Sequence, residues 1–168
     1  GRWNDRFFLN QLTREEMNAE ADLVVNTITE EVIDEALDKF PGEVKNFSLK
    51  TERIDDKLKS RRKQLIKAAD DYYLHLAERV NVLGTEKDDY ISAIGLADGD
   101  LHVRVYDAKK DGSADEMFYD RVFHKNETRE VVIYGLDGDD LFVLEGEASG
   151  IRLRRIGGTD SDKVATKG

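Results

Sequence analysis

The feature that most constrains the fold is a long amphipathic segment between Thr51 and Val80. Its apolar residues recur at steps of three, four or seven positions, which places them on one face of a helix. They are Ile54, Leu58, Leu65, Ala69, Tyr72, Leu76 and Val80. We therefore predict one long helix, about 45 Å in length at roughly 1.5 Å per residue. A helix of that length would brace a second half of the protein or dock on a neighbouring domain.

Two shorter helices are expected before it. Thr13 and Glu16 have the spacing of a capping box, in which each side chain accepts a backbone N–H of the other residue. The capping pattern returns between Thr27 and Glu30, which predicts that a first helix ends there and a second begins. Pro41 and Gly42 then end the second helix.

After Gly84 the pattern changes to short alternating segments, clearest between Leu101 and Tyr106. Asp98-Gly99 and Asp111-Gly112 predict hairpin turns, because glycine adopts the positive φ that such turns require. Further strands are expected near residues 118–123, 129–134, 141–144 and 151–156. The predicted fold is α+β: N-terminal helices including the long one, then an antiparallel β meander or a short β-solenoid. We expect a helical half (1–84) and a β-rich half (85–168) that form one structural unit of a larger protein.

Composition narrows the possible partners. The 168 residues carry a formal net charge of −10, so nucleic acid and anionic membrane surfaces would repel the chain. No apolar run approaches the length of a membrane span, which predicts no direct membrane insertion by this segment. The 39% of hydrophobic residues is enough for a core, and cysteine is absent, so no disulfide or thiolate chemistry is available.

One pair of motifs in the sequence matches a known calcium-binding pattern. The segment from Gly135 to Val143 fits the calcium-binding nonapeptide G-G-x-G-x-D-x-U-x, with Leu136 in place of the second glycine. The segment from Gly157 to Ala165 fits the same frame, with Asp160 in place of the third glycine. In such motifs a glycine-rich turn directs carbonyl and carboxylate oxygens at a hard cation. The first glycines lie 22 positions apart, so the two turns would sit at one corner of successive coils.

These motifs leave two interpretations open. They are either calcium sites or simply Asp-rich β-turns, since turns select glycine and aspartate for conformational reasons alone. For calcium, the candidate ligands are Asp140 and Asp162, followed by Asp137, Asp139 and Asp160. No catalytic site is predicted: the three histidines lack metal-site spacing, the adjacent carboxylates point to different helix faces, and no P-loop, G-x-S-x-G or G-x-G-x-x-G motif occurs.

Several separated segments resemble one family of large Gram-negative surface proteins. The segments are Leu58–Leu65, Ala69 with Tyr72-Tyr73, Val80–Thr85, Glu127–Asp140 and Arg155–Gly158. In that family the matching region follows a calcineurin-like metallophosphoesterase domain and precedes an outer-membrane β-barrel of the bacterial surface antigen type. The resemblance runs from about Leu12 to Val164 and implies a periplasmic or cell-surface location. It transfers no catalytic residue, because the phosphoesterase metal-binding motifs are absent from this chain.

Three functional hypotheses follow. The first is a non-catalytic spacer or docking module of an envelope protein, whose partners are the neighbouring domains of its parent chain and which calcium stabilises at the Gly-Asp turns. The second is an accessory domain of a metallophosphoesterase, in which the parent protein rather than this segment is the enzyme. The third is a glycan- or ligand-binding β module that uses exposed aromatic residues.

Overall fold

The computed structural model describes residues 9–41, 54–146, 150–158 and 160–167, and its fold is α+β. The chain divides into two compact units. Residues 12–73 form the first, which we call the helical unit, and residues 1–11 with 74–168 form the second, the β unit. Within the described ranges, no helix combines the length and the apolar character that crossing a membrane requires.

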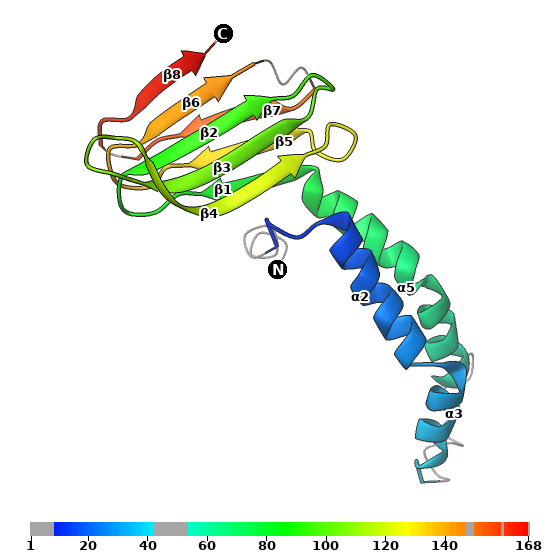
Figure 1. Ribbon diagram of the computed structural model, residues 1–168. Helices are drawn as coiled ribbons and strands as arrows, with labels where there is room; N and C mark the ends of the chain where they lie inside the picture. The colour runs from blue at the N-terminus through cyan, green and yellow to red at the C-terminus, as the bar shows by residue number, and fades with distance from the viewer. Residues whose placement is uncertain (1–8, 42–53, 147–149, 159, 168) are drawn as a thin grey trace. The chain divides into compact units, whose positions relative to one another are not determined.

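The helical unit contains the three predicted helices. Helix α2 spans Arg14–Thr27, α3 spans Glu30–Asp38 and α5 spans Ile54–Ala77, so the end of α5 continues into the β unit (Figure 1). Thr13 and Glu16 form the complete capping box of α2, and the Thr29 hydroxyl accepts the Val32 N–H at the start of α3. The capping box at Thr13 is therefore confirmed, and α3 begins near the second predicted signal, but its N-cap is Thr29 and Thr27 is the last residue of α2.

Polar contacts hold the helices of this unit together. Arg14 donates two hydrogen bonds, of 2.6 and 2.7 Å, to the two carboxylate oxygens of Asp70. Those bonds, with help from Asn18, lower the pKa of Asp70 to about 2. Arg62 donates to the carbonyl oxygens of Val25 and Ile28, at 2.8 and 2.6 Å, where α2 ends. The arginine thereby satisfies carbonyls that have no partner within the helix.

The long helix ends earlier than its apolar pattern predicts. Residues 51–53 lie outside the described ranges, and Val80, the last residue of the predicted stripe, lies in strand β1 (Arg79–Leu83) instead. Val80 is 3% exposed and belongs to the core between the sheets. A single apolar residue at helical spacing cannot extend a helix when the next residues, Asn81-Val82-Leu83, pair more favourably as a strand.

The β unit consists of two sheets that enclose one apolar core (Figure 1). The three-stranded sheet has the order β1-β5-β7 and the five-stranded sheet has the order β4-β3-β2-β6-β8. The bounds of the remaining strands are β2 Asp89–Gly95, β3 Leu101–Ala108, β4 Ala114–Phe123, β5 Glu130–Tyr134, β6 Leu141–Glu145, β7 Arg152–Ile156 and β8 Lys163–Lys167. The core side chains alternate along these strands, as in β2, β3 and the end of β4.

The unit combines both predicted β arrangements. Strands β1, β5 and β7 are parallel, and so are β2, β6 and β8, so each of three coils contributes one strand to each sheet. Coil 1 is β1 and β2, coil 2 is β5 and β6, and coil 3 is β7 and β8. Strands β3 and β4 are antiparallel additions to β2, connected through turns in which Gly99 and Gly112 have φ of 91° and 79°. A short β-solenoid thus carries a hairpin inserted between its first two coils.

Candidate functional site

The five predicted ligands lie in two stacked turns at one end of the coils. Asp137, Asp139 and Asp140 lie in the turn of coil 2, between β5 and β6. Asp160 and Asp162 lie in the turn of coil 3, between β7 and β8. The two turns are adjacent because their flanking strands pair in register, with Glu130 beside Arg152 and Leu141 beside Lys163. The predicted stacking at one corner of successive coils is therefore observed.

The structure adds a third copy of the motif, which the sequence analysis missed. Coil 1 has a turn from Gly84 to Asp89, and the pairing of Arg79 with Glu130 places this turn directly beside the one in coil 2. All three turns share one frame, a glycine followed five residues later by an aspartate. The pairs are Gly84 and Asp89, Gly135 and Asp140, and Gly157 and Asp162. The same frame could have revealed the first copy, but the inserted β3–β4 hairpin separates it from the second by 51 positions instead of 22.

Hydrogen bonds connect the aspartates of this frame into a ladder. The Asp89 N–H donates to Asp140 Oδ1 at 3.0 Å, and the Asp140 N–H donates to Asp162 Oδ1 at 3.3 Å. The carboxylates of Asp140 and Asp162 therefore each accept the N–H of the corresponding aspartate in the preceding coil. Asp89 and Asp140 are 0% and 1% exposed, which makes them buried structural groups rather than surface charges. We call Asp89, Asp140 and Asp162 the aspartate ladder.

A second row of carboxylates binds the turns from the solvent side. Asp88 accepts the Asp139 N–H at 2.9 Å, and Asp139 accepts the Ser161 N–H at 3.1 Å. Asp160 accepts the Gly138 N–H at 3.0 Å. Turn backbones have few partners of their own, so these side chains satisfy donors that the sheets leave open.

The glycines of the frame make room for these carboxylates. A Cβ atom at Gly84, Gly135 or Gly157 would lie closer than 3.0 Å to a carboxylate oxygen of the aspartate in the same turn. Gly138 is required for a different reason, because it has φ of 102° and a Cβ there would lie 2.5 Å from the backbone of Lys87 in coil 1. The nonapeptide glycines thus permit close stacking of the turns.

The environment of the aspartate ladder disfavours the ionised form of its two buried carboxyl groups, Asp89 and Asp140. Burial, and to a smaller extent the carboxylates of Asp89 and Asp162, raises the pKa of Asp140 to about 6. Burial also raises the pKa of Asp89, despite hydrogen bonds from Thr85. Asp140 Oδ2 has no hydrogen-bond partner among the described residues. Among the described carboxyl groups of the β unit, Asp140 is therefore the one that most favours its neutral form.

The donor chemistry suits calcium, but the arrangement of the described residues does not offer a complete cage. Carboxylates are the oxygen ligands that calcium prefers. Among the residues that the structure describes, however, no three His, Cys, Asp or Glu side chains are grouped closely enough to hold a metal ion. Four of the five candidates, Asp139, Asp140, Asp160 and Asp162, accept backbone N–H groups instead, and Thr159 of the second motif lies outside the described ranges. Calcium binding stays a prediction.

Two of the three histidines are held by carboxylates on the β3–β4 hairpin. His102 Nε2 lies 2.5 Å from Asp120, and His124 Nδ1 lies 2.6 Å from Asp100. The Asp100 carboxylate also accepts the Lys125 N–H at 2.9 Å, which ties the end of β4 to the loop before β3. Both pairs thus contribute to the structure of the hairpin.

Comparisons of the chain with protein-family models, with curated proteins and with solved structures found no match.

Proposed function

We propose that this chain is a non-catalytic spacer or docking module of a larger bacterial envelope protein. The proposal rests on one observation, which is that the turn carboxylates bind backbone N–H groups. The side chains that most resembled a functional centre, Asp139, Asp140, Asp160 and Asp162, accept backbone N–H groups and join the three coils. Carboxylates that bind backbone N–H groups of a neighbouring coil make the stacked turns rigid, and a spacer or a docking scaffold needs this rigidity.

The envelope assignment is supported by the resemblance to the region between a metallophosphoesterase domain and an outer-membrane β-barrel. It implies a periplasmic or cell-surface location, with the neighbouring domains of the parent chain as partners. The net charge of −10 favours these partners over nucleic acid. The alternative role within the same parent is an accessory domain of the metallophosphoesterase.

A hydrolysis assay tests the non-catalytic part of the proposal. The purified chain is incubated with bis(p-nitrophenyl) phosphate and p-nitrophenyl phosphate in the presence of Mn²⁺, Zn²⁺ or Ca²⁺. We expect release of nitrophenol at the rate of the metal-containing buffer, with no difference between the wild type and Asp140→Asn. Metal-dependent turnover that the variant abolishes would show that the turn carboxylates are catalytic and would overturn the proposal.

One observation favours glycan binding as a second candidate. Tyr90 and Tyr106 form an edge-to-face pair with ring centroids 5.8 Å apart, and strand pairing places Met117, 47% exposed, beside Tyr106. Partly exposed aromatic rings are surfaces on which sugars stack. Retention of the chain on insoluble peptidoglycan, lost in Tyr106→Ala, would favour this function over the spacer.

A further inference from the structure

Among the residues that the structure describes, each strand of coil 3 has an edge with no paired strand, and we call these two edges the free edge of coil 3. In the described part of the chain, β7 pairs only with β5 and β8 pairs only with β6. The Arg152 N–H donates to the Arg129 carbonyl and the Ile156 carbonyl accepts the Gly135 N–H, both at 2.9 Å, so residues 152, 154 and 156 direct their backbone groups toward β5. By the alternation of a parallel sheet, Leu153 and Arg155 direct theirs to the free edge. The same reasoning, from the 2.8 Å bond between Lys163 N–H and the Asp140 carbonyl, assigns Val164 and Thr166 to the free edge of β8.

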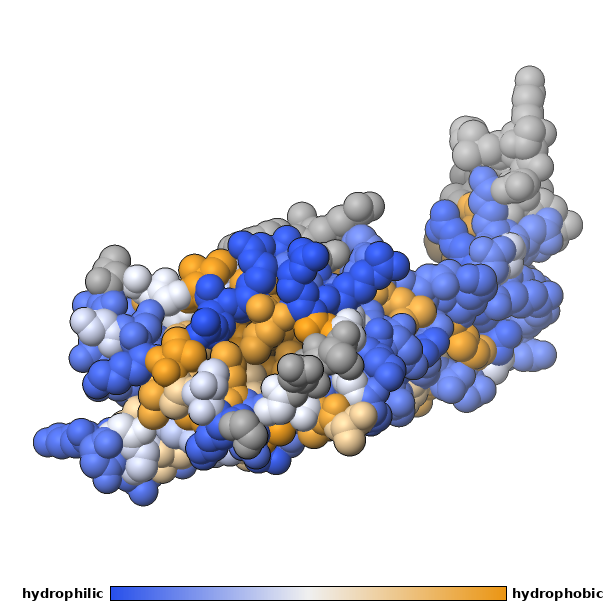
Figure 2. Space-filling model, turned by 90° about the horizontal axis from the view of Figure 1, so that it is seen from above, coloured by the Kyte–Doolittle hydropathy of each residue, from blue (hydrophilic) through white to orange (hydrophobic). Residues whose placement is uncertain are grey.

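The side chains of this coil do not close the core. Val164 follows Ile91 and Phe142 in the strand register, yet it is 51% exposed, whereas those two residues are 1% and 2% exposed. Ile156 is 38% exposed. Figure 2 views the β unit from the side on which β8 lies in Figure 1, and it shows apolar side chains exposed between polar ones. An edge of this kind is a template for a further strand.

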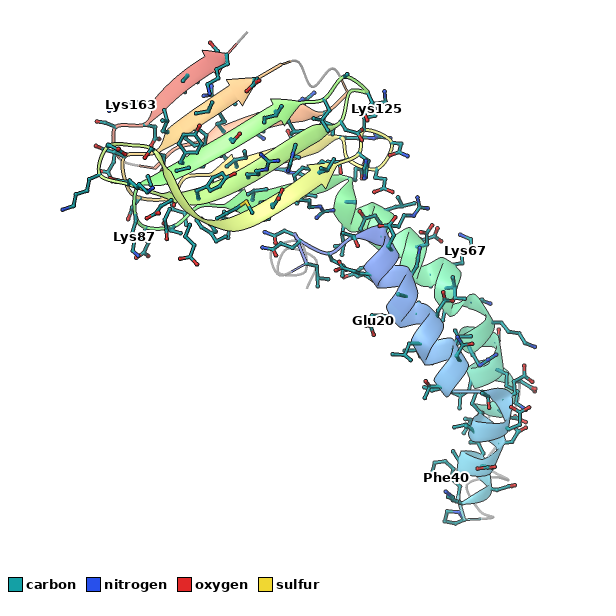
Figure 3. The ribbon with its side chains drawn as sticks, viewed as in Figure 1. Glu20, Phe40, Lys67, Lys87, Lys125 and Lys163 are labelled. Atoms are coloured by element: carbon teal, nitrogen blue, oxygen red, sulfur yellow. The ribbon has the colours of Figure 1, made fainter. Side chains whose placement is uncertain are left out.

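Charge distinguishes this edge from the rest of an acidic protein. Coil 3 carries five cations against two aspartates, although the chain as a whole has a net charge of −10. The cations are Arg152, Arg154, Arg155, Lys163 and Lys167. Arg155 lies over the Phe142 ring at 5.8 Å, and Lys163 and Lys167 have no carboxylate partner among the described residues. Lys163 lies at the start of the outermost strand, β8 (Figure 3).

The strand register shows which partner fits. Arg79, Glu130 and Arg152 occupy the same position in β1, β5 and β7, so the charges alternate across the sheet. Glu130 is 16% exposed and lies 3.2 Å from Arg79 and 3.9 Å from Arg152. A strand added beyond β7 would place a carboxylate at this position to continue the alternation. In coils 1 and 2, the N–H groups of Asp89 and Asp140 each donate to the aspartate of the next coil. The N–H of Asp162 occupies the same position in coil 3. The turn that follows the added strand would place an aspartate beside it.

We propose that the free edge of coil 3 binds an acidic strand–turn–strand segment of a partner protein, which adds in parallel as a fourth coil. The proposal rests on the docking role proposed above and identifies the surface that performs it. A second copy of this chain is a poorer occupant, because antiparallel pairing of two β7 edges would bring arginines together. Cationic edges deter such self-pairing while leaving acidic strands attractive.

The sequence of coil 2 supplies a probe, since coil 2 adds to coil 1 in the way the partner would add to coil 3. We would measure fluorescence anisotropy of a labelled synthetic peptide with the sequence of residues 128–146 as the full-length chain is added. This peptide has five carboxylates against one arginine. We expect saturable 1:1 binding that weakens at least tenfold in Arg152→Glu. The matched control is Arg61→Glu on α5, an exposed cation far from the edge in sequence, and it should change the affinity less than twofold.

Backbone methylation of the peptide separates strand addition from simple charge attraction. In coil 2, Glu130 donates its N–H to the Glu78 carbonyl, so Glu130, Val132 and Tyr134 face the preceding coil. N-methylation at Val132 should therefore weaken binding at least tenfold, while N-methylation at Ile133, which faces away, should leave it within twofold.

Each other outcome overturns the inference. Equal affinities of the two methylated peptides would mean nonspecific charge attraction. Absence of saturable binding would mean that the edge is closed to added strands. Dimerisation of the chain itself in sedimentation analysis, abolished by Arg152→Glu, would assign the edge to a second copy. None of these results depends on the hydrolysis assay, so the docking surface and the non-catalytic role can fail separately.

Discussion

Replacing Asp140 by Asn tests the structural interpretation of the aspartate ladder most directly. Burial and the neighbouring carboxylates raise the pKa of Asp140 from an ordinary value of 3.8 to about 6. At 1.36 kcal/mol per pKa unit, ionising this group in the folded protein costs about 3 kcal/mol more than in the unfolded chain. An asparagine keeps the Oδ1 acceptor for the Asp89 N–H but carries no charge.

The sign follows from the direction of the shift. The folded state binds the Asp140 proton more tightly than the unfolded state, so wild-type stability falls as pH rises from about 4 to above 6. Asp140→Asn should lose most of this slope, and at pH 7.5 it should be more stable than the wild type by up to about 3 kcal/mol. Asp140→Ala is the matched control: it removes the same charge but also the acceptor, leaves the buried Asp89 N–H unpaired, and should therefore be about 1 to 3 kcal/mol less stable than Asp140→Asn.

The assay is urea unfolding in a chelator between pH 4.5 and 7.5, followed by the near-ultraviolet circular dichroism of tyrosine. Amide cross-peaks of β5 and β6 report the β unit separately from the helical unit. The reasoning is refuted if Asp140→Asn is less stable than the wild type by more than about 1 kcal/mol at pH 7.5, or if its pH slope equals that of the wild type.

Three further predictions concern the turns and the helical unit. Gly138→Ala should lower the free energy of unfolding by more than about 3 kcal/mol, because its Cβ would meet the Lys87 backbone. Gly112→Ala, also at positive φ but in open space, should lower it by only about 1 to 2 kcal/mol. The urea unfolding midpoints of the two variants test this difference. Calcium at a hundred times its dissociation constant should stabilise the chain by about 2.7 kcal/mol if the turns bind it, and equal melting curves in calcium and chelator would reduce the motifs to turns. Since Arg14 holds the pKa of Asp70 at about 2, the stability from this pair should be present above pH 4 and decline as pH falls toward 2. The helical circular dichroism of Asp70→Asn should lack that decline, and a decline like that of the wild type would contradict the assignment.

Much of the fold is local in origin and was predictable for that reason. The capping residues Thr13 and Thr29 act on backbone groups three residues away, so their effect is contained in the sequence pattern itself. The hairpin glycines, Gly99 and Gly112, adopt positive φ through their own lack of a Cβ. The 22-residue spacing of the Gly-Asp motifs likewise indicated stacked coils, because equal spacing returns a chain to the same corner.

Other properties depend on partners distant in the chain. Val80 follows a helical pattern but pairs with Val131, a strand 51 positions later, and that pairing ended the helix. The first Gly-Asp turn was hidden because the β3–β4 hairpin interrupts the repeat, so only the strand register reveals it. The role of the turn aspartates was also undetermined, since a carboxylate suits a cation and a backbone N–H equally well.

The sequence by itself therefore determined the helix caps, the hairpin turns, the α+β class and the acidic character, all of which follow from interactions within a few residues or from summed charge. Only the tertiary structure decided that Asp89, Asp140 and Asp162 form one ladder, that Asp140 is buried with a raised pKa, and that the cations of coil 3 lie on strands with one paired edge among the described residues. The physical reason is that desolvation, inter-coil hydrogen bonds and strand edges arise only when segments far apart in the chain are brought together.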